Sequence, residues 1–182
     1  MVSKLKIVYK EKVVKILFQK LNCKNIHQVP KLVKIQINRG LGLSAQNNII
    51  LNKTINEFRV ISGQQSTITR ARNSVAGFKI REEMPLGVTV TLRGNKMFAF
   101  MDRFINLALP RSRDFQGLSP KGFDNFGNYT VGLNEQLLFP ETSYDSVDQM
   151  RGFNITFVTT AKTRDEGFLL LWELGLPIRE KN

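Results

Sequence analysis

A positively charged segment between residues 58 and 81 is the clearest chemical signal in this sequence. Its basic side chains, with no acidic one among them, are Arg59, Arg70, Arg72, Lys79 and Arg81. Threonine, serine and asparagine residues lie between them. Guanidinium and ammonium groups bind phosphate oxygens, and hydroxyl and amide groups bind sugars and base edges. The segment therefore predicts RNA binding, and a solvated basic loop is the alternative.

A second set of polar side chains is predicted on one face of a sheet. Residues 32–39, 86–93 and 153–161 alternate between apolar and polar side chains, which predicts half-buried strands. The outward positions hold basic, amide and hydroxyl side chains but no carboxylate: Lys34, Gln36, Asn38, Thr89, Thr91, Arg93, Asn154 and Thr156. This face is a candidate surface for RNA, because an ordinary solvated face would also carry Asp and Glu. An ordinary solvated face remains the alternative.

The charge of the whole chain points to an anionic partner. The chain has 27 Lys and Arg against 15 Asp and Glu, a formal net charge of +12, and 42% hydrophobic residues. This hydrophobic content is typical of a globular domain and not of a disordered basic tail. Residues 1–39 carry ten basic residues and one acid, whereas residues 140–182 carry five and seven. We therefore expect one basic region and a polyanionic partner, with a basic protein that binds no polyanion as the alternative.

The residue types that common enzyme chemistry needs are scarce. Cys23 is the only cysteine and His27 the only histidine, which excludes a zinc ribbon and a histidine-rich metal site. Asp114 and Asp124 fall in one predicted loop, but nothing in their spacing indicates an acid–base pair. We therefore predict a protein that is not an enzyme and that has no cofactor or metal. An RNA-modifying enzyme, which would need an acid, a base or a cofactor cleft, is the alternative from another class.

Apolar residues at helical spacing predict four helices. They cover residues 3–22, about 48–61, 95–108 and a last segment that begins with a capping box of Thr163 and Glu166. The first helix has a basic outer face. Asn47 or Asn48 is the predicted cap of the second helix, and Gly63 stops it. Pro110 ends the third helix.

Several apolar side chains are expected in the core. Val33, Ile35 and Ile37 would point inward from the first strand, and Trp172 would do so from the last helix. Phe78 is expected inside as well, and stacking on a base or a sugar is its alternative.

The order of these elements predicts an α+β fold. Alternating strands favour an antiparallel sheet that has helices packed on one face and leaves the other face open for RNA. We expect one domain over residues 1–182, with long loops at about 65–85 and 111–128. Loops of this length inside a domain are usually functional.

Several motifs resemble ribosomal protein five of the large subunit, in its bacterial and plastid form. They are residues 70–81 (RARNSVAGFKIR), 91–94 (TLRG), 110–115 (PRSRDF), 127–129 (GNY), 139–141 (FPE) and 159–162 (TTAK). The resemblance extends over nearly the whole chain. It implies a structural component of the central protuberance that binds 5S rRNA and the large-subunit rRNA. It also implies a curved antiparallel sheet, in agreement with the alternation.

The resemblance assigns roles to particular positions. The implied 5S rRNA contacts are Lys34, Asn38, Gln64, Thr91 and Arg93. A loop near the P-site tRNA would contain Arg70, Arg72, Asn73, Ser74, Lys79 and Arg81. A contact with a small-subunit protein at the intersubunit bridge would involve residues 110–145. This sequence departs from the family at three positions. Asn73 stands where the family commonly has a basic residue, and Gln116 and Phe126 stand where it commonly has arginine.

The same resemblance bears on where the protein works. Residues 38–42 (NRGLG) and 45–47 (AQN) are most similar to cyanobacterial and plastid members. High Asn, Lys and Ile usage indicates an AT-rich genome, and no apolar signal region precedes the first predicted helix. We expect a chloroplast ribosome, with the cytoplasm of a low-GC bacterium as the alternative. A free regulatory RNA-binding protein is the remaining alternative for function.

Overall fold

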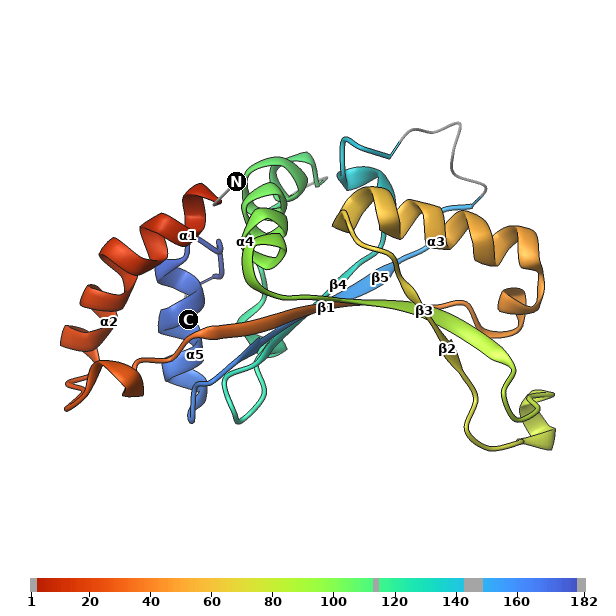
Figure 1. Cartoon of the computed structure of the whole chain (residues 1–182), viewed down its shortest axis with the longest axis horizontal. Helices are drawn as coiled ribbons and strands as arrows, with labels where there is room; N and C mark the ends of the chain where they lie inside the picture. The colour runs from red at the N-terminus through yellow and green to blue at the C-terminus, as the bar shows by residue number, and fades with distance from the viewer. Residues whose placement is uncertain (1–2, 113–114, 143–148, 180–182) are drawn as a thin grey trace. The chain divides into compact units, whose positions relative to one another are not determined.

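Five strands form one open antiparallel sheet in the order β2–β3–β1–β5–β4, with helices packed against it (Figure 1). The strands are β1 (Leu32–Gly40), β2 (Thr67–Arg70), β3 (Pro85–Leu92), β4 (Tyr129–Leu133) and β5 (Phe153–Thr159). This computed structural model describes residues 3–112, 115–142 and 149–179. The predicted α+β class is confirmed.

The helices are α1 (Lys4–Val8), α2 (Val14–Lys20), α3 (Asn48–Ser62), α4 (Gly94–Arg103) and α5 (Arg164–Glu173). A π-helical turn, Tyr9–Val13, joins α1 to α2, so the predicted helix at 3–22 is one helix with a widened turn. A second π-helical turn, Phe104–Ala108, extends α4. The chain then leaves the helix through a short 3-10 turn that contains Pro110, as predicted.

Local hydrogen bonds explain where two of these helices begin and end. Asn47 caps α3, because its side-chain oxygen accepts the N–H of Ile49 at 3.0 Å. Gly63 ends the same helix with a φ of 67°, a left-handed conformation that favours glycine. The Thr163 hydroxyl accepts the N–H of Glu166 at the start of α5. In a capping box the Glu166 carboxylate would accept the N–H of Thr163. Here it accepts the N–H of the preceding residue, Lys162.

The chain folds as two compact units. The first unit comprises Met1–Ile35, Leu92–Val131 and Thr156–Asn182. Its core is aromatic: the rings of Phe104 and Tyr129 lie 5.9 and 6.4 Å from that of Phe157 in β5, and all three side chains are buried. Gly167 of α5 touches Gly127, and a Cβ atom added to Gly167 would lie 2.6 Å from the Gly127 Cα. The absence of side chains at these two positions therefore lets the helix and the turn meet.

The second unit comprises Gln36–Thr91 and Gly132–Ile155. Helix α3 packs on the sheet through Phe58, whose ring lies 5.9 Å from that of Phe153 in an edge-to-face arrangement. Ile37 of β1 and Val88 and Val90 of β3 are buried, as their alternation predicts. The intervening polar residues of these two strands consequently project on the opposite face.

Three predictions about the core were wrong. Val33 is 40% exposed because two residues, Val33 and Lys34, separate the buried Leu32 from the buried Ile35 and interrupt the alternation. Trp172 is 39% exposed and stacks on Phe168, while Leu170 and Leu171 fill the core. Phe78 is 71% exposed, since it lies in the 3-10 turn Ala76–Phe78 at the tip of a hairpin.

Candidate RNA interface

The outward face of the second unit brings together most of the side chains predicted on β1 and β3. Gln36 donates to the Thr89 hydroxyl at 3.5 Å, and that hydroxyl donates to the carbonyl of Ile37 at 3.1 Å. Gln64, which follows α3, donates its amide to the Thr91 carbonyl at 3.1 Å. These bonds hold two amides and a hydroxyl against the strands, where the side-chain oxygen of Gln64 and the Thr91 hydroxyl are left to meet a ligand.

Three predicted contact residues have side chains without a hydrogen bond or ion pair to any described residue: Asn38, Thr91 and Arg93. Asn38 is exposed on β1 between the buried Ile37 and Arg39. Arg93 belongs to the first unit, where it is exposed at the residue that precedes α4. Lys34, also of the first unit, is half-buried on β1. None of the five strands contains Asp or Glu, so no carboxylate on the strands repels an anionic ligand.

The predicted tRNA-side loop is a hydrogen-bonded hairpin between β2 and β3 (Figure 1). Val75 and Ile80 pair near its tip at 2.9 and 3.1 Å, and the Ser74 hydroxyl accepts the N–H of Glu82 at 2.9 Å. Arg70 donates to the carbonyl of Glu83 at 3.0 Å. Ser74 and Arg70 therefore support the hairpin from within.

The remaining predicted side chains of the hairpin lie at its surface, with Arg72, Asn73 and Lys79 among the residues around the tip. Lys79 follows the tip with a φ of 55°. The exposed ring of Phe78 sits beside it, so the tip offers cations for phosphates and an aromatic face for a base or a sugar. Arg81 is exposed on the returning arm of the hairpin.

Sequence reasoning missed the most elaborate polar cluster, which is buried in the second unit. Arg39 donates to the Glu57 carboxylate at 2.6 Å, to the side-chain amide oxygen of Gln136 at 2.9 Å and to the backbone carbonyl of Arg151 at 3.3 Å. Its guanidinium carbon lies 4.9 Å from the centre of the Phe58 ring. Burial lowers the pKa of Arg39, and Glu57 opposes this change.

This cluster is structural, because Arg39 is only 1% exposed and its hydrogen bonds all point inward. One signal could have revealed it. Ile35, Ile37 and Arg39 occupy alternate positions of β1, and all three are buried. Glu57 is next to Phe58 in the sequence and is buried with it on α3. A charged residue at an apolar position on each of two elements indicates a buried pair.

Of the residues that the sequence offers for catalysis, Asp124 has a structural role and His27 lies at the surface. Asp124 accepts the N–H groups of Phe126 and Asn128 and so forms a turn, whereas Asp114 lies outside the described residues. His27 is exposed on the 3-10 turn Ile26–Gln28. Among the described residues no three His, Cys, Asp or Glu side chains are grouped to hold a metal ion. No described helix is both long enough and apolar enough to cross a membrane.

The fold and its polar surfaces define a class, the small basic α+β proteins whose open sheet face has the composition of an RNA-binding surface. Comparison with known families is more specific. Residues 25–81 match the family described as Ribosomal protein L5, and residues 85–178 match the ribosomal L5P family C-terminus. The chain belongs to the ribosomal protein L5 family. It is therefore a structural constituent of the large ribosomal subunit and not an enzyme, as the sequence predicted.

Individual relatives match over nearly their full length. "Large ribosomal subunit protein uL5c" of Heterosigma akashiwo is 61% identical over 176 residues, which are 97% of both chains. The protein of the same name in Tupiella akineta is 54% identical and covers 99% of this chain and 100% of its own. "Large ribosomal subunit protein uL5" of Prochlorococcus marinus is 57% identical over 93% and 94% of the two chains. Both kinds of relative expected from the sequence, plastid and cyanobacterial, are thus present.

Proposed function

We propose that this chain binds 5S rRNA through Lys34, Asn38, Gln64, Thr91 and Arg93, and thereby helps to anchor that RNA in the central protuberance. The observation that carries the proposal is the polar, carboxylate-free face of the strands. Asn38 and Thr91 supply an amide and a hydroxyl for sugars and base edges. Arg93 and Lys34 supply charge for phosphates. The bond from Gln64 to Thr91 preorganises the surface, because it fixes the amide before RNA arrives.

Replacement of Arg93 by alanine tests this proposal. We expect 5S rRNA binding to weaken by roughly 1–3 kcal/mol, which is the range for a charge-assisted contact. The measurement is filter binding at fixed salt, with circular dichroism to confirm folding. Arg111→Ala is the matched control, since it removes the same charge from an exposed position on the 3-10 turn Leu109–Arg111, outside the proposed 5S rRNA contacts. Equal affinity of the Arg93 variant and the parent would refute the assignment.

The hairpin tip is proposed to approach the P-site tRNA. Its exposed cations can bind the phosphates of an RNA backbone, and a base or a sugar can stack on the Phe78 ring. This surface uses other residues than the 5S rRNA contacts, so the two activities are separable by mutation.

The double variant Arg72→Ala with Lys79→Ala is expected to release P-site tRNA faster, by a factor on the order of ten for two exposed charged contacts. It should bind 5S rRNA as the parent does. The measurement is tRNA dissociation from reconstituted ribosomes that carry the variant. Loss of 5S rRNA binding together with unchanged tRNA retention would show that the two surfaces are assigned the wrong way round.

Residues 110–145 are proposed to contact a small-subunit protein, and residues 113–114 and 143–145 of this range lie outside the described part of the chain. The Phe126 ring is 71% exposed on the turn that Asp124 forms. An exposed phenyl group suits a protein partner better than a phosphate.

The plastid names of the algal relatives assign the chain to chloroplast ribosomes.

A further inference from the structure

The sulfur of Met84 ties the returning arm of the hairpin, residues 79–84, to the body of the second unit. The backbone N–H of Arg81 donates to this sulfur at 3.4 Å, and the side-chain amide of Gln46 donates to it at 3.7 Å. Gln46 ends the 3-10 turn Gly42–Gln46, which lies between β1 and α3. One thioether, a weak acceptor, therefore joins the hairpin to a segment 38 residues earlier in the chain.

Met84 lies where a small solute can approach it. It is half-buried and lines a surface hollow of about 830 Å³, together with its two exposed donors, Gln46 and Arg81. Met97 and Met101 of α4, by contrast, are only 2% and 0% exposed. Met150 is 50% exposed, but its side chain makes no hydrogen bond to any described residue. Among the methionines that the structure describes, Met84 thus combines access with a structural bond.

The arm that Met84 holds is bent at both ends. Lys79 has a φ of 55° and Glu83 a φ of 62°, in the left-handed region that residues with a side chain rarely adopt. Such conformations persist only where neighbouring interactions hold them. The bond from Arg81 to the Met84 sulfur lies between these two residues, so its loss would let the arm relax.

We propose that Met84 is a reversible oxidation site that controls the order of the hairpin, with hydrogen peroxide as the oxidant. The sulfur donates an electron pair to one peroxide oxygen, the O–O bond breaks, and after proton transfer the products are methionine sulfoxide and water. The sulfur loses two electrons and the peroxide gains them. A methionine sulfoxide reductase reverses the step with two thiols, which become a disulfide while the oxygen leaves as water.

Oxidation disturbs both hydrogen bonds of the sulfur. A thioether has two lone pairs, and the new oxygen takes the place of one of them. A donor that points at this lone pair must draw back, because it would collide with the oxygen. The lone pair that remains is a poorer acceptor, since the oxygen withdraws electron density from the sulfur. Either sulfoxide epimer therefore loosens Arg81 and weakens the connection of the hairpin to Gln46.

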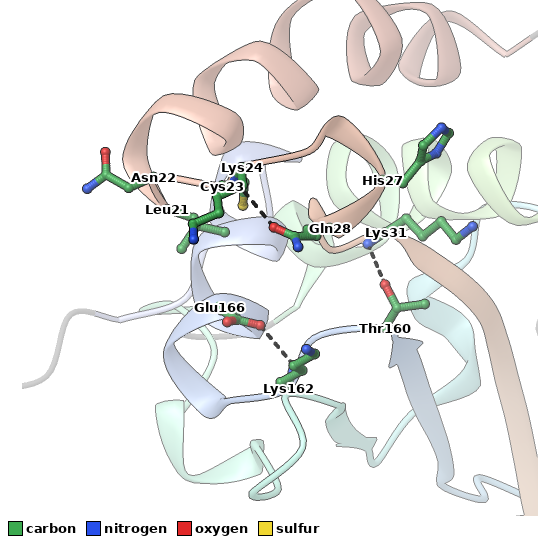
Figure 2. A pocket seen from close by; sticks show the side chains of 10 residues that line it. All are labelled: Leu21, Asn22, Cys23, Lys24, His27, Gln28, Lys31, Thr160, Lys162 and Glu166. Atoms are coloured by element: carbon green, nitrogen blue, oxygen red, sulfur yellow. Dashed lines mark hydrogen bonds between the residues drawn. The ribbon is translucent and has the colours of Figure 1, made fainter.

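Hydrogen exchange of the full chain, measured by NMR after treatment with peroxide, tests the site. Cys23, the only thiol, lines a hollow of the first unit (Figure 2) and can also be oxidised, so every sample carries Cys23→Ser. Mass spectrometry should find one added oxygen on Met84 and on Met150, and much less on the buried Met97 and Met101. The Arg81 N–H should then exchange roughly three- to tenfold faster, as expected for the loss of one hydrogen bond.

Two leucine variants separate the effects of the exposed methionines. Met150→Leu should keep the full response to peroxide, and a methionine sulfoxide reductase with dithiothreitol should restore its slow exchange. Met84→Leu should exchange the Arg81 N–H fast from the start and show no further change. If Met84 stayed reduced like Met97 and Met101 while Met150 was oxidised, the proposal would be overturned. Unchanged exchange at Arg81 in protein oxidised at Met84 would overturn it too.

A functional consequence rests on the proposed approach of the hairpin tip to the P-site tRNA. Ribosomes reconstituted with oxidised Met150→Leu protein should release this tRNA faster than those with the reduced protein. The same treatment of Met84→Leu protein should change nothing, and 5S rRNA binding should stay as it is in every sample. Faster exchange at Arg81 together with unchanged tRNA retention would support the oxidation site and refute the tRNA contact, so the two proposals fail separately.

Discussion

Arg39→Met is expected to lower the free energy of unfolding by about 3 kcal/mol or more. The substitution keeps a long apolar side chain between the rings of Phe58 and Phe153, so it isolates the loss of the charge. Glu57, only 8% exposed, would be left without its partner in a largely buried site. The cost of an unpaired buried carboxylate dominates, because the pair itself contributes little beyond the desolvation of its two charges.

Urea unfolding of the single variant and of Arg39→Met with Glu57→Leu measures this effect. The double variant removes both charges and should recover most of the lost stability. A double variant that is less stable than Arg39→Met would contradict the account, since it would mean that the carboxylate is well satisfied without the arginine.

Gly167→Ala is expected to cost about 3 kcal/mol of stability, at the upper end for an overpacked site. Two effects compete at this position. Within a helix alanine is favoured over glycine by about 1 kcal/mol. A Cβ atom here would nevertheless collide with the Gly127 carbonyl oxygen and lie 2.6 Å from its Cα, and backbone cannot rotate away as a side chain can. The collision therefore exceeds the gain in helix propensity.

Thermal and urea unfolding of the Gly167 variant provide the measurement, and Gly40→Ala is its control. Gly40 has no atom within 4 Å of the position where a Cβ would be, so its variant should stay within about 1 kcal/mol of the parent. If the Gly167 variant proved as stable as the control, α5 and the Gly127 turn would have to separate at almost no cost.

Most of the elements follow from the sequence because they depend on neighbours along the chain. The cap at Asn47, the stop at Gly63 and the alternation in β3 are all local patterns, and the structure has them. The exposed Phe78 could not be predicted from its residue type. An aromatic ring is buried only if other segments cover it, and the hairpin tip is too short to do so.

The polar sheet face was predictable for the same reason, since an outward position is fixed by the buried residues on either side of it. The pattern of the sequence points to the pair of Arg39 and Glu57, but not to the other partners of Arg39, which come from the 3-10 turn Gln136–Leu138 and from the residue Arg151. Which charged residues meet inside a protein depends on packing between distant segments.

The two π-helical turns, Tyr9–Val13 and Phe104–Ala108, have a consequence for chain length. A π turn closes its hydrogen bond one residue later than an α turn, so it stores one inserted residue without breaking the helix. Deletion of a residue within Tyr9–Val13 could be absorbed by a return to α geometry, whereas a deletion in α2 would shift every following side chain by about 100° around the axis. Variation in length among relatives is therefore expected to concentrate in these turns, and engineered deletions are best placed there.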